Sequence, residues 1–242
     1  MTALRAAWRL LRLVPHVLHG LWIVRRRFEL LDAASRHQLI QWWSVKTLRI
    51  LGISLTSQGS ALPQGHLLVA NHVSWLDIAA VHAVLPQARF VSKADVKHWP
   101  LAGTLVEGVG TLFIERSSKR DALRVVHQTA AALQAGDCVA VFPEGTTGTG
   151  PALLPFHANL LQAAVSTGAP VLPLVLRWHE PGERFSTAAQ FVGATTLAQS
   201  LWRIAGARGL GIDVQILPSV PADGQDRRAL GEALRSAISA RL

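Results

Sequence analysis

The sequence predicts an α/β protein with a mostly parallel central sheet flanked by helices. Past residue 52, short apolar runs alternate with longer amphipathic stretches, which is the pattern of strands and helices in such a sheet. Half of the 242 residues are hydrophobic and only 16% are charged, so the chain can build a sizeable core. Several apolar runs end abruptly in polar residues, and strand ends of this kind are where open α/β sheets form their sites.

We expect two parts: an N-terminal helical, membrane-associating segment over residues 1–51 and an α/β domain over residues 52–242. The single cysteine, Cys138, lies in an apolar run, so we expect a core residue and no intramolecular disulfide.

The elements of the α/β domain follow from its periodicity. The expected strands cover residues 67–70, 89–92, 111–115, 139–142, 171–176 and 214–217. The expected helices lie near residues 75–84, 101–109, 120–134, 159–167 and 227–240. The stretch 193–211 shows no pattern that assigns an element.

The N-terminal segment holds most of the positive charge. Residues 1–50 contain nine basic and two acidic residues in a chain of net charge +9, together with four of its eight tryptophans. Arg5, Arg9, Arg12, His16 and His19 recur at steps of three and four, so they form one stripe on a helix. The remaining face is rich in leucine, valine and tryptophan, and it is wider than the apolar face of a soluble surface helix.

The longest uncharged run in this segment covers residues 13–24 and includes Pro15, which is too short for a bilayer span of about 20 residues. A second amphipathic stretch follows over residues 35–51. We predict two amphipathic helices that lie in or dip into one leaflet, with their arginines meeting anionic lipid. The alternatives are a helical pair packed on the globular domain or in a dimer interface, and single-stranded nucleic acid binding by arginine beside tryptophan.

The first strand end with candidate catalytic side chains follows residues 67–70. The apolar run stops at Asn71 and His72, Ser74 is placed to cap the next helix, and Asp77 falls in its first turn. A bend between His72 and Asp77 would bring a carboxylate to the imidazole, and an imidazole so held can act as a general base. The alternative is a structural histidine and a solvated acid.

Two further strand ends are polar. Arg116 follows the strand at 111–115, where its guanidinium could hold a phosphate or form a surface ion pair. Glu144 follows the strand at 139–142 and opens a loop rich in glycine and threonine, which offers N–H groups and hydroxyls to an anion. The sequence has no Walker loop, no Gly-x-Ser-x-Gly and no His-Glu-x-x-His, which disfavours those nucleotide-binding and hydrolase types.

Four blocks in this order resemble the lysophosphatidic acid acyltransferase (glycerophospholipid acyltransferase) family. The first is Asn71-His72-x4-Asp77, and the others are residues 110–116, 142–146 and 169–175. The resemblance covers roughly residues 60–180. Each block alone is weak, but the ordered set is specific.

The resemblance implies transfer of a fatty acyl group from acyl-CoA or acyl-carrier protein to the free hydroxyl of a lysolipid. His72 would be the catalytic base and Asp77 would orient it, with no acyl-enzyme and no metal or redox cofactor. The implied partners are membrane lipid and the acyl donor, at the cytoplasmic face of a bacterial inner membrane; nucleic acid is not expected, and nothing indicates an oligomeric state. The residues implied to bind substrate are Asn71, Arg116, Glu144, Gly145, Thr146 and Thr147.

The chain departs from the family pattern at Thr147 and Gly148, where the third block usually continues with arginine and serine. Threonine keeps a hydroxyl but lacks the charged fork of arginine. A similar Glu-Gly-Thr-Thr version occurs in relatives that acylate lyso-ornithine lipid, whose acceptor has no phosphate. Because Arg116 remains, the expected acceptor is 1-acyl-sn-glycerol 3-phosphate, and lyso-ornithine lipid is the alternative. A non-enzymatic basic protein that binds lipid or nucleic acid is a remote alternative.

Overall fold

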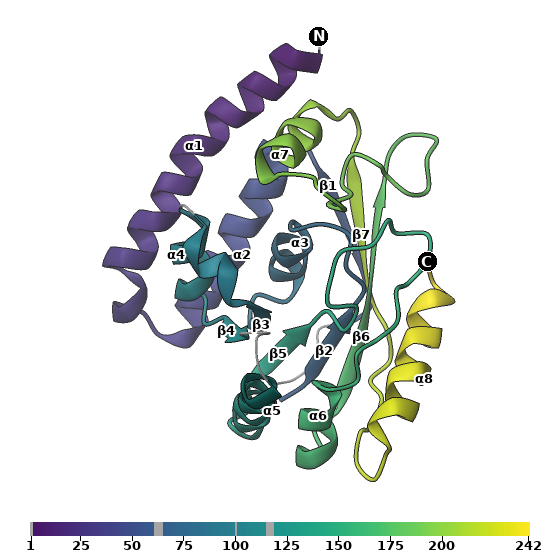
Figure 1. Cartoon of the computed structure of the whole chain (residues 1–242). Helices are drawn as coiled ribbons and strands as arrows, with labels where there is room; N and C mark the ends of the chain where they lie inside the picture. Colours follow the sequence, from purple (N-terminus) through teal and green to yellow (C-terminus); the bar gives the residue numbers. More distant parts are fainter. Residues whose placement is uncertain (1, 61–64, 100, 115–118) are drawn as a thin grey trace.

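A computed structural model of the chain describes residues 2–60, 65–99, 101–114 and 119–242. Arg116, the expected phosphate contact, lies outside the described residues. Within them the chain forms one seven-stranded sheet with helices on both faces (Figure 1). The strands are β1 Ser54–Gln58, β2 Leu67–Ala70, β3 Ala88–Lys93, β4 Leu112–Ile114, β5 Cys138–Val141, β6 Val171–His179 and β7 Gly211–Ile216.

The strand order in the sheet is β1-β7-β6-β2-β5-β3-β4. All neighbours pair in parallel except β6 and β7, which are antiparallel. The predicted α/β class with a mostly parallel sheet is therefore confirmed. Because β2, β3, β4 and β5 run the same way, their carboxyl ends meet at one edge of the sheet, and this edge receives the polar strand ends noted in the sequence.

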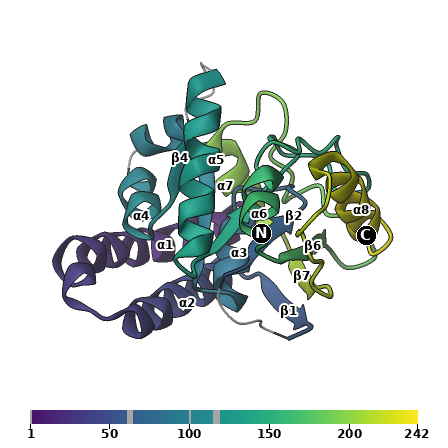
Figure 2. The ribbon, with the colours of Figure 1, turned by 90° about the horizontal axis from the view of Figure 1, so that it is seen from below.

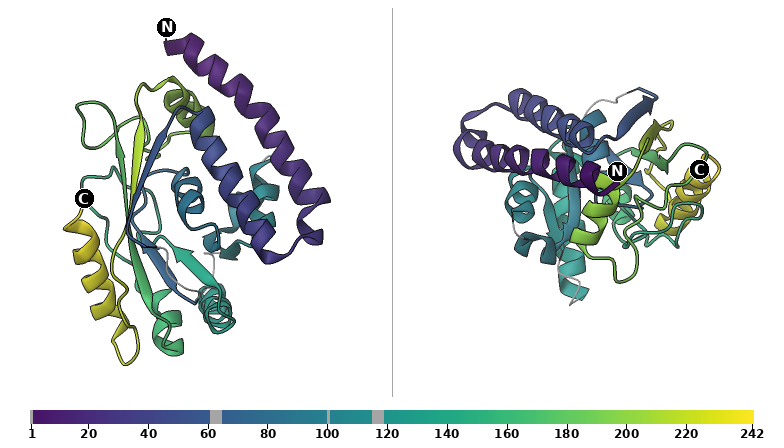
Figure 3. Two further views of the ribbon diagram at one scale, coloured as in Figure 1. Left: turned by 180° about the vertical axis from the view of Figure 1, so that it is seen from behind. Right: turned by 90° about the horizontal axis from the view of Figure 1, so that it is seen from above.

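Two helical layers cover the sheet, as Figures 1 and 3 show. The helices are α1 Thr2–Arg26, η1 Phe28–Leu30, α2 Ala33–Ile50, α3 Asp77–Val84, η2 Ala94–His98, α4 Ala102–Gly108, α5 Lys119–Gln134, α6 Leu161–Thr167, α7 Leu197–Gly206 and α8 Arg227–Ser239. Alternate residues of β2 point to opposite sides of the sheet: Leu68 belongs to the core under α1, α2, α3 and α7, whereas Leu67 belongs to the core under α5, α6 and α8.

Strand β1 and helix α7 were not predicted from the sequence, and β7 begins earlier than expected. The polar edge strand β1 is mostly exposed, so it shows no apolar run. Helix α7 lies in the unassigned stretch 193–211 and begins with a capping box, in which the Thr196 side chain accepts from the Gln199 amide and Gln199 bonds back to the Thr196 backbone. The Thr-x-x-Gln pattern of this capping box is visible in the sequence, so the start of α7 could have been predicted. Strand β7 starts at Gly211 instead of residue 214.

Helix α3 begins at Asp77, two residues later than expected, and Leu76 takes the N-cap position with no side-chain hydrogen bond. The prediction that Ser74 caps the helix is therefore wrong. The Ser74 hydroxyl instead accepts from the Leu76 amide at 3.3 Å, in the turn before the helix. The helix starts later because the Asp77 carboxylate accepts from the backbone amides of Val73 and Ser74. These bonds hold residues 73–76 in a turn before the first helical residue.

Helices α1 and α2 lie side by side along one flank of the molecule, with α8 on the far side (Figure 2). Helix α1 is held by two of its arginines. Arg5 donates to the Gly206 carbonyl at 3.0 Å, and Arg9 donates to the carbonyls of Ala205 and Ala207 at 3.1 and 2.8 Å. These carbonyls end α7, where orphan C=O groups and the helix dipole favour cations. The prediction that the arginine stripe meets lipid is therefore wrong for Arg5 and Arg9, which face the protein.

The opposite face of α1 is apolar and exposed. Its large side chains are each at least half exposed, and nothing in the described structure covers them. They recur at helical spacing along the full helix: Leu4, Trp8, Leu11, Val14, Leu18 and Trp22. No described helix is both long enough and apolar enough for a bilayer crossing.

Candidate functional site

The site is built around His72, the second residue after β2. The imidazole Nδ1 lies 2.8 Å from Asp77 Oδ2, as the spacing of the two residues predicted. Because a carboxylate only accepts, Nδ1 carries the proton and Nε2 keeps its lone pair. One face of the ring stacks on Phe142, with centroids 3.9 Å apart and planes 7° from parallel, and 19% of the side chain remains exposed.

Asp77 is fully buried, and four groups donate to its carboxylate. Besides His72, the amides of Val73 and Ser74 reach Oδ2 at 2.7 and 2.9 Å, and the Trp178 indole N–H reaches Oδ1 at 2.6 Å. Hydrogen bonds to the charged form stabilise a buried carboxylate. Trp178 was missed in the sequence, because it lies on β6 about a hundred residues away and a lone tryptophan beside an apolar strand reads as core.

Glu144 fixes the backbone of His72. Its Oε1 accepts from the His72 amide and its Oε2 accepts from the Leu154 amide, both at 2.8 Å. The Gly148 amide also donates to the His72 carbonyl at 2.7 Å. Burial raises the pKa of the Glu144 carboxyl above its ordinary value of 4.5, and the two amide bonds offset part of this rise.

Two residues expected to bind substrate, Asn71 and Glu144, are bonded to the backbone around His72. Asn71 is 1% exposed, and its side-chain amide exchanges two hydrogen bonds with the backbone of Leu176, at 2.9 and 2.8 Å. This pair ties the end of β2 to β6. Glu144 is likewise buried, with both carboxylate oxygens occupied by backbone amides. Neither residue is among those that line the cavity near His72, and a role of either in substrate binding stays a prediction.

Replacing Glu144 with glutamine should destabilise the fold by about 1–3 kcal/mol, because the new NH₂ group cannot accept from one of the two buried amides. The sign of the pH effect follows from the raised pKa: protonated Glu144 favours the fold below pH 4.5, and this contribution is lost as the pH rises through the folded-state pKa. Denaturant titrations should show a larger stability gap between wild type and Glu144→Gln at low pH than at neutral pH. An equal gap at both would contradict the assignment.

The loop after Glu144 borders the site with Gly145, Thr146 and Thr147. The Thr147 hydroxyl donates to the carbonyl of Phe191, whose amide in turn donates to the Val73 carbonyl at 3.0 Å. This contact ties the loop to the segment 188–191. Arg203 of α7 secures the same segment by donating to the carbonyl of Ala188 at 3.0 Å.

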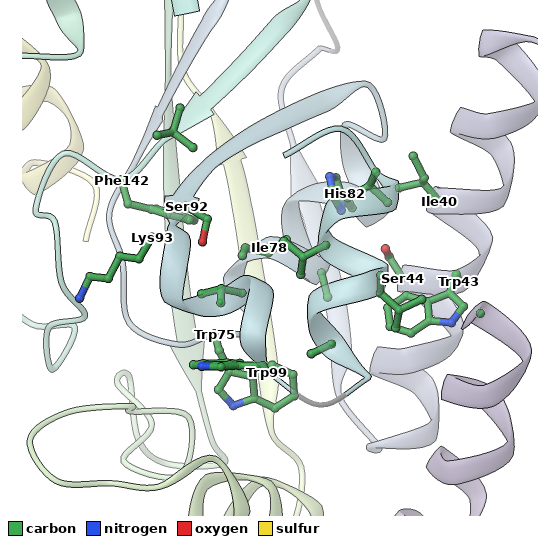
Figure 4. Close-up of a pocket in the computed structure, with 18 of the residues that line it drawn as sticks. Ile40, Trp43, Ser44, Trp75, Ile78, His82, Ser92, Lys93, Trp99 and Phe142 are labelled. Carbon is green, nitrogen blue, oxygen red and sulfur yellow. The ribbon is translucent and has the colours of Figure 1, made fainter. Parts of the chain in front are cut away.

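A cavity of about 500 Å³ extends from His72 between the helices on this side of the sheet. Figure 4 shows Phe142 and Trp75 toward one end and Ile40, His82, Ser44 and Trp43 toward the other. Most of the lining is apolar and comes from α1, α2, α3, α4 and η2. Its size and character suit a hydrocarbon chain.

One cation borders the cavity in the described part of the chain. Lys93, at the carboxyl end of β3, is exposed and extends away from the apolar end (Figure 4). It shares the sheet edge with His72 and was missed in the sequence. Across the residues that the structure describes, no group of three or more His, Cys, Asp or Glu side chains is arranged to hold a metal ion.

A histidine held by a buried carboxylate at the mouth of an apolar cavity is suited to moving an acyl group between oxygen or sulfur atoms. A protein-family model described as Acyltransferase matches residues 54–177. The chain belongs to this acyltransferase family.

Individual relatives agree with the family model. A lyso-ornithine lipid O-acyltransferase from Pseudomonas aeruginosa is 36% identical over 98% of this chain and 93% of its own length. A 1-acyl-sn-glycerol-3-phosphate acyltransferase from Neisseria gonorrhoeae is 38% identical over 78% of this chain and 74% of its own length. The crystal structure of the 1-acyl-sn-glycerophosphate acyltransferase PlsC from Thermotoga maritima has the same fold, with a TM-score of 0.67, 18% identity and coverage of 96% and 95% of the two chains.

Proposed function

We propose that the protein transfers a fatty acyl group from acyl-CoA or acyl-carrier protein to the free hydroxyl of a lysolipid, most simply 1-acyl-sn-glycerol 3-phosphate. The observation that supports this best is the bond of Asp77 to His72, which lines the apolar cavity. The cavity would take the acyl chain of the donor and hold its thioester near His72 Nε2. The reaction itself needs no metal or redox cofactor.

The proposed reaction is a direct displacement. His72 Nε2 removes the proton of the acceptor hydroxyl as its oxygen attacks the thioester carbonyl carbon. The C–S bond of the tetrahedral intermediate then breaks, and the leaving thiolate takes the proton from the imidazolium. Asp77 stabilises that imidazolium and keeps the proton on Nδ1. The products are the acylated lipid and a free thiol, and holding both substrates together replaces an acyl-enzyme.

The acceptor is argued from the charges around the site. Lys93 borders the cavity, and Arg116 follows β4 in the sequence; both favour an anionic headgroup such as phosphate. Thr147 favours the second candidate, lyso-ornithine lipid, because the hydroxyl stands where the family pattern has a guanidinium and is engaged by Phe191. The relative that is 36% identical over nearly the whole chain is a lyso-ornithine lipid O-acyltransferase.

The test is an acceptor panel with the purified full-length protein in mixed micelles, run once with an acyl-CoA donor and once with an acyl group on acyl-carrier protein. Product formation is compared for 1-acyl-sn-glycerol 3-phosphate, its choline and ethanolamine analogues, and lyso-ornithine lipid. Acylation of the phosphate monoester alone supports the first acceptor, and acylation of lyso-ornithine lipid alone supports the second. No product from any acceptor, with acyl-CoA and with acyl-carrier protein, would refute the proposal.

Replacing Thr147 with arginine should shift acceptor preference toward the phosphate monoester by about tenfold or more, since a charge-assisted bond is worth roughly 1.5–3 kcal/mol. The substitution also breaks the hydroxyl bond to Phe191. Thr147→Val, which removes that bond without adding charge, is the matched control. The ratio of kcat/KM for the two acceptors is measured in each variant, and an equal shift in both would assign the effect to the lost Phe191 contact.

We further propose that α1 docks the enzyme on the membrane through its exposed apolar face. The bond of Arg5 and Arg9 to α7 turns this face outward, and Arg12, Arg25 and Lys46 remain exposed for anionic headgroups. Such docking fits the cytoplasmic face of a bacterial inner membrane, where lysolipid and acyl donors meet.

Replacing Trp8 and Trp22 together with alanine should weaken binding to anionic vesicles by about tenfold or more, because a buried large apolar side chain contributes about 1.5–3 kcal/mol. Leu123→Ala, at an exposed leucine of α5, is the matched control and should bind as wild type. Vesicle co-sedimentation measures both. Unchanged binding of the double variant would favour a protein partner for this face.

A further inference from the structure

The inner end of the cavity is apolar, but two polar side chains reach it from adjoining helices. Ser44 on α2 and His82 on α3 line the cavity together with Ile40, Ile78 and Trp43. Figure 4 shows both side chains in the same region of the cavity, beyond Ile78 from the Phe142 end. The two helices adjoin here, because Gln41 of α2 donates to the Ala83 carbonyl at the end of α3, at 3.1 Å.

His82 lines the cavity and keeps one ring nitrogen as an acceptor. It is 5% exposed, and its Nε2 lies 2.9 Å from the Ala88 carbonyl. Because a carbonyl only accepts, Nε2 carries the proton and Nδ1 is an acceptor. Burial lowers the pKa of His82 to about 4, so the ring is neutral at physiological pH, and the edge-on contact with Phe90 fixes its plane. Among the described residues, Nδ1 has no hydrogen-bond partner.

Ser44 supplies the complementary group. It is 1% exposed, and its hydroxyl makes no hydrogen bond to any residue that the structure describes. A serine hydroxyl can both donate and accept. Ser44 and His82 both line the cavity beside aliphatic side chains, so their polar groups are open to an occupant that carries a polar group of its own.

We propose that Ser44 and His82 form a subsite for a hydroxyl group carried on the acyl chain of the donor. The hydroxyl donates to His82 Nδ1 and accepts from Ser44 Oγ, so one acceptor and one donor of the protein are satisfied at once. Aliphatic neighbours on either side, such as Ile40 and Ile78, contact the methylenes that flank it. This inference rests on the proposed function, which places the acyl chain of the donor in this cavity.

The test is a competition between acyl donors with the full-length enzyme. Hexadecanoyl-CoA is mixed with an equal amount of a hydroxyhexadecanoyl-CoA, in a series that moves the hydroxyl one carbon at a time, and the products are quantified by mass spectrometry. The product ratio reports the ratio of kcat/KM values. One position, or two neighbouring ones, should be preferred over the plain chain by about tenfold, as expected for two hydrogen bonds gained. Other positions should be disfavoured, because they bury an unpaired hydroxyl.

Three variants locate the effect. Ser44→Ala and His82→Phe should each bring the preferred ratio close to one, whereas Ile78→Val, an apolar lining change, should retain the preference. The ratio compares two donors in one tube, so partial loss of folded protein does not alter it. Wild type that transfers hexadecanoyl groups but prefers no hydroxyl position overturns this inference and leaves the proposed function intact. Absence of transfer from every donor overturns the proposed function and the inference with it.

Discussion

Replacing His72 with alanine is expected to lower kcat by about 10³-fold, within the range that general acid–base catalysis contributes. Nε2 is the basic nitrogen of His72, which lines the cavity, and no other described imidazole borders the Phe142 end of this cavity. KM for the lysolipid should change little, because a proton acceptor acts mainly in the transition state. Steady-state rates with radiolabelled donor measure the effect.

The control for this prediction is His82→Phe, which removes the other imidazole that lines the same cavity. With hexadecanoyl-CoA, the loss in this variant should be far smaller than in His72→Ala. Thermal denaturation of both variants shows whether each is folded. A folded His72→Ala enzyme with near wild-type kcat would mean that another group removes the proton, and the proposed mechanism would be abandoned.

Replacing Asp77 with asparagine should lower kcat by about 10³- to 10⁴-fold and also destabilise the fold. The amide oxygen can take the place of Oδ2 and keep the bonds to His72, Val73 and Ser74. Its NH₂ group then faces the Trp178 indole N–H, so two donors meet in a buried site, which costs about 1–3 kcal/mol. The lost negative charge no longer stabilises the imidazolium, and the rate falls for that separate reason.

A second substitution separates the two effects. Trp178→Phe removes the opposing donor, so Asp77→Asn should destabilise the Trp178→Phe protein less than it destabilises wild type. The rate should stay low in the double variant, because the charge is still missing. Denaturant titrations and kcat of the four proteins complete the cycle. Rates that recover along with stability would show that Asp77 acts by folding alone.

Local pattern was enough to predict much of the sheet and the central pair of the site. The apolar runs of β2 and β5 are buried on both faces, so they stand out as strands. His72 and Asp77 are only five residues apart, so their contact could be predicted without knowing which distant segments pack beside them. Strand β1 was missed because an exposed edge strand has no apolar run. Helix α7 was not predicted, although the Thr196–Gln199 capping box at its start is visible in the sequence.

The fold class, the His72–Asp77 pair and the departure at Thr147 could be predicted from the sequence, because each depends on residues that are close along the chain. The contacts that hold the His72–Asp77 pair become visible only in the folded protein. The Trp178 bond to Asp77 and the Glu144 bond to the His72 amide join separate strands, and no spacing encodes them. The same holds for Arg5: its charge predicted a contact with lipid, but in the folded protein it donates to the Gly206 carbonyl at the end of α7. A side chain's chemistry is set by its residue type, but its partner is set by how the strands and helices come together.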